Sequence, residues 1–126
     1  MMAGMTTNSI SLVLDCSDPT ALAAFWSKAI GYVELGSVEN YTLLAPDGAE
    51  GPQLLLQRVP ETKAGKNRMH LDIHTPDIQA EASRLEGLGA TRVTADVMEE
   101  HGHAWVLMAD PEGNEFCVAG ASTPHL

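Results

Sequence analysis

The order of predicted secondary-structure elements occurs twice in this chain, on the two sides of a linker at residues 59–67. In each half, a stretch of alternating apolar and polar residues precedes a helical stretch, and three more short strands follow. The order is therefore β-α-β-β-β in module one, at about residues 9–58, and again in module two, at about residues 68–119. Each module alone is too small to bury a good hydrophobic core. We therefore expect the two modules to fold together as a single domain over residues 1–126.

Two helices are predicted at corresponding places in the modules. In module one, the helix spans Thr20–Ile30, directly after Pro19, whose fixed backbone angle suits a first helical turn. In module two, the helix spans about Ile78–Leu88. The glycines that follow, Gly31 and Gly89, favour the left-handed conformation that commonly ends a helix.

Short alternating stretches predict the strands, and turn-forming residues between them predict where each strand ends. The predicted strands are residues 10–16, 32–35, 41–44, 53–58, 68–74, 91–97, 104–108 and 115–119. Residues 36–40 and 98–102 are predicted as turns. If the modules pair edge to edge, the result is an α+β fold. In it, two paired βαβββ modules form a curved mixed sheet with the helices on its convex side.

The stretch 68–74, Arg-Met-His-Leu-Asp-Ile-His, alternates strictly between polar and apolar residues. The apolar residues share one face of such a strand, and the other face carries Arg68, His70, Asp72 and His74. Side chains that can bind a ligand, carry charge or coordinate a metal, and that share one strand face, favour a strand that lines a cleft. An exposed polar face with local charge pairing is the alternative interpretation.

The chain carries 17 acidic and 7 basic residues, which gives a formal net charge of −10. This charge disfavours nucleic acid and anionic membrane surfaces as partners, and it is compatible with a neutral or cationic small-molecule ligand. No apolar run is long enough to span a membrane, and the first residues do not read as a signal peptide. Because two cysteines are too few for a disulfide scaffold, we expect a reduced, cytoplasmic protein.

Four stretches resemble the vicinal oxygen chelate superfamily, which includes glyoxalase I, bleomycin-resistance proteins, fosfomycin-resistance enzymes and extradiol dioxygenases. These stretches are Asp18–Trp26, Ile30–Tyr32, Lys66–Asp72 and Asp110–Cys117. The last two closely resemble a glyoxalase-like subgroup that is common in actinobacterial proteins. The resemblance covers about residues 9–119 and implies the paired-module fold, but it does not specify one activity.

The resemblance also implies a divalent metal ion in the cleft, held by the first and last strands of each module. In this sequence the implied ligand positions fall at Ser11, Gln57, His70 and Cys117. Hard octahedral ions prefer histidine and carboxylate ligands, so only His70 matches well. Histidine and cysteine suit zinc if Asp72 or a neighbour on the same face joins them. We therefore predict that His70 is a ligand of one divalent ion, and we do not expect classical glyoxalase I activity.

Six residues are candidate substrate-binding groups: Arg68, Asp72, His74, Trp105, Cys117 and Gln57. Trp105 either stacks on a flat ligand in the cleft or packs in the core. Cys117 is either a reactive thiol whose pKa His70 lowers or a small core residue, which is the commoner role. Arg68 either clamps a ligand carboxylate or phosphate or pairs with an acid across the sheet.

Two classes of function fit these residues. The first is an enzyme with a concave cleft for a small oxygen-bearing molecule. In it, His70 is the candidate catalytic residue, as a metal ligand or a general base, and the reaction is of the metal-assisted lyase, isomerase or dioxygenase type. The second is a metal-free protein that binds and sequesters a small molecule, as bleomycin-resistance proteins do. Because a free module edge permits pairing within one chain or between two chains, we expect a homodimer.

Overall fold

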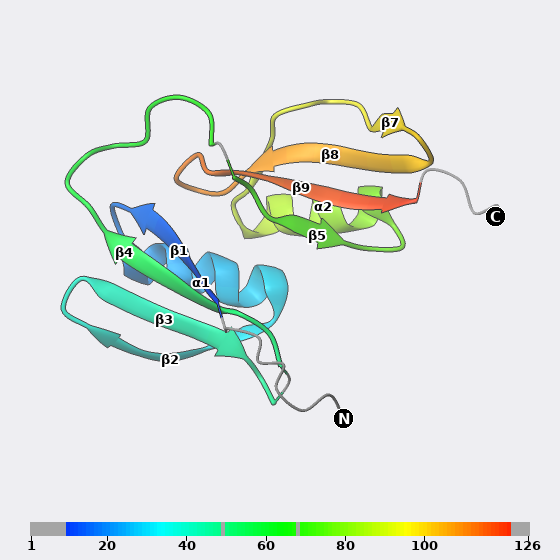
Figure 1. Ribbon diagram of the computed structural model, residues 1–126. Coiled ribbons are helices and arrows are strands. Elements are labelled where there is room, and N and C mark those ends of the chain that lie inside the picture. The colour runs from blue at the N-terminus through cyan, green and yellow to red at the C-terminus, as the bar shows by residue number, and fades with distance from the viewer. Residues whose placement is uncertain (1–9, 49, 68, 122–126) are drawn as a thin grey trace, which may run out of the picture.

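The computed structural model describes residues 10–48, 50–67 and 69–121, which form two modules side by side (Figure 1). Module one contains β1 (Ser11–Cys16), α1 (Pro19–Ile30), β2 (Tyr32–Val38), β3 (Tyr41–Pro46) and β4 (Gln53–Arg58). Module two contains β5 (Asp72–His74), α2 (Ile78–Leu88), β6 (Thr91–Arg92), β7 (Met98–Glu100), β8 (His103–Ala109) and β9 (Glu115–Ala121). Both helices occur where they were predicted.

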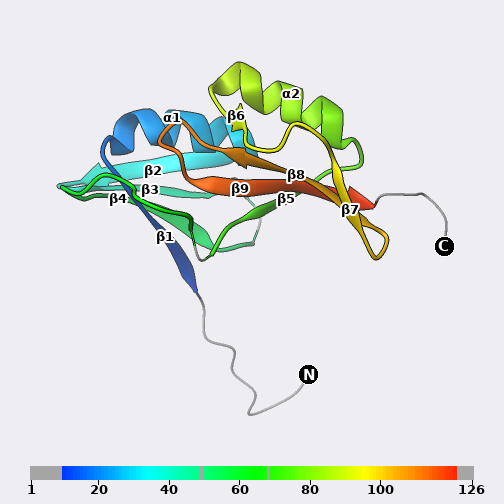
Figure 2. The same cartoon turned by 90° about the horizontal axis from the view of Figure 1, so that it is seen from above.

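Each module builds its own mixed sheet. In module one the strand order is β1-β4-β3-β2, with β1 parallel to β4 and the other neighbours antiparallel. In module two the order is β5-β9-β8-β6, β7 also pairs with β8, and only β5 and β9 are parallel. Figure 2 shows α1 and α2 on the same side of the two sheets. The predicted α+β fold of paired modules is therefore confirmed, although the modules form two sheets rather than one. Among the described residues, no helix covers the other face of the sheets, which is called the open face below.

Local sequence explains both helices. The side chain of Asp18 precedes α1 and accepts a hydrogen bond from the backbone N–H of Ala21 at 3.2 Å. Asp77 caps α2 in the same way and accepts from the N–H of Ala80 at 3.0 Å. Each cap satisfies a backbone donor that the first helical turn leaves unpaired. Gly31 then ends α1 with a φ of 73°, a conformation that favours glycine. Neither of these helices is long and apolar enough to cross a membrane.

The hydrophobic core contains residues from both modules. Trp26 on α1 packs edge-on against Phe25 of its own helix and Phe116 of β9, with ring centroids 5.2 and 5.1 Å apart. The Trp26 indole N–H also donates to a carboxylate oxygen of Asp110, 3.0 Å away, in the turn between β8 and β9. Asp110 is only 3% exposed, and the side-chain amide of Asn114 donates to it as well. The first helix is therefore tied to the last hairpin.

The predicted strand at residues 68–74 is shorter in the structure. Only Asp72–His74 pairs with β9, in parallel register. The ladder continues by one further bond, from the backbone N–H of Cys117 to the carbonyl of Leu71 at 2.9 Å. Because β5 lies at the edge of its sheet, the residues before it have a partner strand on one side only. Arg68, the first residue of the predicted strand, lies outside the described residues.

The predicted strand at residues 91–97 is also too long. Only Thr91–Arg92 pairs with β8. The backbone N–H groups of Val93 and Thr94 both donate to the carbonyl of Leu107, at 2.8 and 3.2 Å. Two donors on one acceptor break the regular alternation of a ladder, so the strand ends there.

Both predicted turns are shorter than expected. Of residues 98–102, the first three form β7, and the turn is limited to His101–Gly102, both with positive φ. Of residues 36–40, the first three belong to β2, which has an irregular register between Glu34 and Gly36. Acidic or glycine-containing stretches can therefore pair as strands when a neighbouring strand supplies the partner groups.

Candidate functional site

A histidine, an aspartate and a cysteine meet on the open face of module two. Asp72 begins β5, and Cys117 lies directly opposite it on β9. Their strand neighbours Ile73 and Val118 pack in the core, so Asp72 and Cys117 point to the other face of the sheet. His70 lies two residues before Asp72, and the side chains of the two residues are in contact. These three residues are called the His-Asp-Cys cluster below.

The three ligand atoms of the cluster all lie within 4.8 Å of one another. His70 Nδ1 is 3.1 Å from Asp72 Oδ1. Because an ionised carboxylate only accepts, Nδ1 carries the proton in this contact, and Nε2 is left as the acceptor nitrogen. The side chains of His70 and Asp72 are 40% and 46% exposed, whereas Cys117 is buried. The cluster is therefore open to solvent on one side and has a buried thiol at its base.

The Cys117 thiol is held in its protonated form. Burial, followed by the charge of Asp72 and a hydrogen bond to it, raises the pKa of Cys117 from 9.0 to about 11, and Lys66 opposes this shift only in part. These causes do not support the interpretation in which His70 lowers the pKa of Cys117. They support the alternative in which Cys117 is a small buried residue. Cys117 and Cys16 are both free, buried cysteines.

A cavity of about 360 Å³ lies between the two modules, next to the cluster. Its walls are mainly apolar and come from both modules: Leu12, Leu14, Trp26, Leu54, Leu71 and Phe116. Ser11, His70 and Glu115 are among the polar residues that line it. A space of this size with few polar groups suits a small organic molecule. His70 is therefore the member of the cluster that such a molecule would meet.

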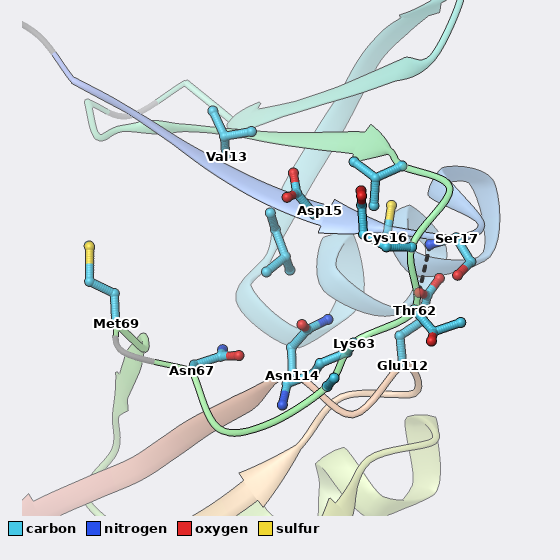
Figure 3. Close-up of a pocket in the computed structure, with 14 residues that line it drawn as sticks. Val13, Asp15, Cys16, Ser17, Thr62, Lys63, Asn67, Met69, Glu112 and Asn114 are labelled. Carbon is cyan, nitrogen blue, oxygen red and sulfur yellow. Dashed lines mark hydrogen bonds between the residues drawn. The ribbon is translucent and has the colours of Figure 1, made fainter.

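A second cavity of about 370 Å³ adjoins the first, and both are lined by Val13, Asn67, Met69 and Asn114. Figure 3 shows this second cavity between β1 and the linker, with polar residues around it that include Asp15, Thr62, Lys63 and Glu112. Both carboxylate oxygens of Glu112 accept backbone hydrogen bonds, from Ser17 at 2.7 Å and from Asp18 at 2.9 Å. The two cavities form one groove, which is apolar near His70 and polar beneath the linker.

The other predicted site residues are spread along the open face. His74 on β5, Ala119 on β9 and Trp105 on β8 form one row across the sheet of module two. Trp105 is half-buried, lies outside the core cluster and does not line the cavity next to His70. Gln57 on β4 lies opposite Asp15 and does not line the cavity next to His70.

Of the four implied metal positions, the structure brings only two into the cluster, His70 and Cys117, and Asp72 joins them. Ser11 lines the same cavity as His70 without belonging to the cluster. Arg68 lies outside the residues that the structure describes. The donor groups of the cluster therefore all come from module two.

Glu115 is a site residue that sequence reasoning missed. Its carboxylate accepts a hydrogen bond from the backbone N–H of Asn67 at 3.0 Å and lies 3.2 Å from Nζ of Lys63. These contacts, the Asn67 bond first, hold the pKa of Glu115 below its usual range although burial opposes them. Alternation along β9 places Glu115 on the same face as Cys117, and this signal was available in the sequence.

Known structures share this fold at low sequence identity. A glyoxalase/bleomycin resistance protein/dioxygenase family enzyme from Burkholderia phytofirmans is 17% identical, with a TM-score of 0.73 over 88% of this chain and 96% of that one. A member of the same superfamily from Sphaerobacter thermophilus is 20% identical, with a TM-score of 0.69 over 91% and 98%. The fosfomycin resistance protein FosX from Listeria monocytogenes is 12% identical, with a TM-score of 0.73 over 94% and 96%.

These identities support a common fold and carry no activity over to this chain. A search of curated proteins found no match. The sequence profile of one family, described as a glyoxalase-like domain, matches residues 11–119, which span β1 to most of β9. The chain therefore belongs to the glyoxalase-like domain family.

Proposed function

We propose that this protein is an enzyme that binds a small oxygen-bearing molecule in the groove between its modules and acts on it through His70. The observation that carries this proposal is the His-Asp-Cys cluster at the edge of an apolar cavity. Asp72 orients the imidazole, and the apolar walls keep water away from a bound molecule. Isomerase, lyase and dioxygenase chemistry all fit this arrangement, whereas classical glyoxalase I chemistry lacks support because Gln57 is outside the cavity.

The donor set of the cluster fits a zinc ion better than a hard octahedral ion. Imidazole, carboxylate and thiolate are the usual zinc ligands, and three protein ligands leave one position for substrate. His70, Asp72 and Cys117 would hold the ion. A zinc ion there would polarise an oxygen of the substrate as a Lewis acid. His70 Nδ1 and Asp72 Oδ1 lie 3.1 Å apart, so both would face the ion once Nδ1 has given up its proton.

The alternative proposal is a metal-free protein that binds a small molecule without changing it. Two observations favour it: the Cys117 thiol is buried with a pKa of about 11, and the groove between the modules is large enough for a ligand without any ion. In that case His70 would contact the ligand rather than react with it. A candidate ligand recovered unaltered after long incubation with the protein would favour this alternative.

Metal content tests the metal-assisted form of the enzyme proposal. The enzyme proposal predicts about one zinc per chain in protein purified without chelator or affinity tag, and its loss in His70→Ala, because removing one of three ligands leaves too few. Inductively coupled plasma mass spectrometry measures this ratio. His74→Ala is the matched control, since His74 lies on the same strand face outside the cluster. Wild-type protein that takes up no metal even after reconstitution would reject the metal-assisted proposal.

We also propose that the chain forms a homodimer through the open face of module one. This face exposes Leu35 and Val38, which are 57% and 70% exposed, beside a hollow that Tyr41, Leu43 and Leu55 line. Apolar side chains gathered on one face favour association. Light scattering after size exclusion should give twice the mass of one chain, and Leu35→Glu should shift it to the monomer mass. A wild-type monomer at all concentrations would contradict this.

A further inference from the structure

The segment that carries His70 is attached to β9 at both of its ends. At one end, the backbone N–H of Cys117 donates to the carbonyl of Leu71 at 2.9 Å. At the other end, the backbone N–H of Asn67 donates to the carboxylate of Glu115 at 3.0 Å. Glu115 and Cys117 are alternate residues of the same strand, so both anchors are on one rigid element. The Glu115 side chain thus continues the attachment where the backbone ladder stops.

The same carboxylate also holds the linker. Its second oxygen lies 3.2 Å from Nζ of Lys63, and Lys63 also donates to the carbonyl of Gly65. The side chains of Lys63 and Glu115 are only 23% and 17% exposed, which makes this contact less accessible to water than a typical surface ion pair. Thr62, Lys63 and Asn67 line the polar cavity in Figure 3. One side chain therefore fixes one wall of the groove.

We propose that Glu115 is a positioning residue for His70 and for the linker wall of the groove. By fixing Asn67 and Lys63, its carboxylate sets where the imidazole of His70 meets Asp72. The catalytic meaning of this role rests on the proposed function. The positioning itself is a property of the free protein and is tested without metal or ligand.

Limited proteolysis with trypsin tests the linker contact. Lys66 is exposed in the linker, and cleavage after it requires the segment to detach from β9. In Glu115→Ala, cleavage after Lys66 should be about tenfold faster, since one charge-assisted hydrogen bond and one ion pair are lost. Glu115→Gln should be intermediate, because the amide oxygen still accepts from Asn67.

The matched control is Glu86→Ala, which removes an ion pair with the same 3.2 Å separation, to Arg92, away from the linker. Its cleavage rate after Lys66 should equal that of the wild type. If circular dichroism shows that Glu115→Ala does not fold, Lys63→Met carries the test. That variant keeps Glu115 and Lys66, and its cleavage after Lys66 should be faster than in the wild type.

Nuclear magnetic resonance of ¹⁵N-labelled protein tests the effect on His70. In the wild type, the ring nitrogen shifts should show the proton on Nδ1, as the Asp72 contact requires. In Glu115→Ala the two ring nitrogens should move towards the shifts of a free imidazole that exchanges between tautomers, and Glu115→Gln should restore much of the wild-type pattern. His74 in the same spectrum is the internal control.

Unchanged cleavage together with an unchanged His70 spectrum in folded Glu115→Ala would overturn the inference. Faster cleavage without any change at His70 would reject the positioning of His70. A wild-type protein that binds neither zinc nor substrate, but in which both readouts respond to Glu115, would reject the proposed function and support the positioning role. The two proposals therefore fail separately.

Discussion

Asp72 contacts both other members of the His-Asp-Cys cluster. Its carboxylate accepts from Nδ1 of His70 at 3.1 Å, which in the metal-free protein leaves Nε2 of the neutral ring as the nitrogen that can accept a proton. On the other side, its charge and its hydrogen bond with Cys117 disfavour the thiolate. The metal-free cluster therefore presents an imidazole acceptor and lacks a thiolate nucleophile at neutral pH.

Asp72→Asn should make Cys117 more reactive and leave Cys16 unchanged. Both thiols have a pKa raised to about 11, but Asp72 contributes to that shift only at Cys117. Because the thiolate reacts, wild-type labelling should be slow at pH 8 and should rise as the pH approaches 11. In Asp72→Asn the labelling of Cys117 should be about tenfold faster at pH 8, which corresponds to one pKa unit.

The measurement is iodoacetamide labelling, followed by mass spectrometry of the two cysteine peptides. Cys16 is the internal control, since its pKa is raised mainly by its own burial. Equal acceleration at both cysteines would indicate a general loosening of the fold instead. No acceleration at Cys117 would contradict the role given to Asp72.

At the scale of elements, two glycines respond to the same substitution in opposite directions. Gly120 lies on β9, and a Cβ added there would lie 2.6 Å from the backbone carbonyl oxygen of Thr75. Gly120→Ala should therefore push β9 away from the end of β5 and lower the free energy of unfolding by about 1–3 kcal/mol. Gly87 lies in α2 with open space around it, so Gly87→Ala should raise that free energy by about 0.5–1 kcal/mol.

Urea denaturation of the two variants and the wild type measures both changes. Equal destabilisation by the two substitutions would show that the close approach to Thr75 does not decide the effect. A stable Gly120→Ala variant would mean that β9 and the end of β5 can separate at little cost.

The helices were predictable because their signals are local. Asp77, the periodic apolar residues and Gly89 all lie within or next to α2, and its observed range equals the predicted one. The strands were harder, because a strand exists only where a distant partner pairs with it. Residues 69–71 alternate like a strand and nevertheless lie outside β5, and residues 98–100 read as a turn and nevertheless pair with β8.

At the scale of the whole molecule, the two modules are joined by specific contacts as well as by a shared core. Arg84 on α2 donates to the carbonyl of Ala29 at the end of α1, at 2.8 Å. Asp110 accepts from Trp26 at the other end of the interface. The single domain predicted for residues 1–126 therefore has a measurable consequence in unfolding.

Thermal unfolding should be a single cooperative transition for both modules. In Trp105→Phe, the buried Trp26 is the remaining tryptophan and reports on the contact between α1 and β9. Its fluorescence and the far-ultraviolet circular dichroism of the whole chain should give the same midpoint, as two-state unfolding requires. Midpoints that differ by several degrees would show that the modules unfold separately.

Only two kinds of site residue were predictable from the sequence. Some share one alternating strand, and others fall at a metal-ligand position that the family resemblance implies. His70 and Asp72 were found by alternation, and Cys117 by resemblance to known proteins. Glu115 was missed because its role depends on Asn67 and Lys63, which reach it across the groove. Gln57 was included because loop lengths do not determine which residues of module one come near His70.

The division of the groove between the modules has a consequence for how such chains diversify. Module two supplies every donor of the cluster, whereas β1 of module one supplies much of the apolar wall, including Leu12 and Leu14. Substitutions in β1 therefore change the shape offered to a ligand and leave the reactive groups in place. Over evolutionary time, ligand preference and chemistry can thus change independently within one domain.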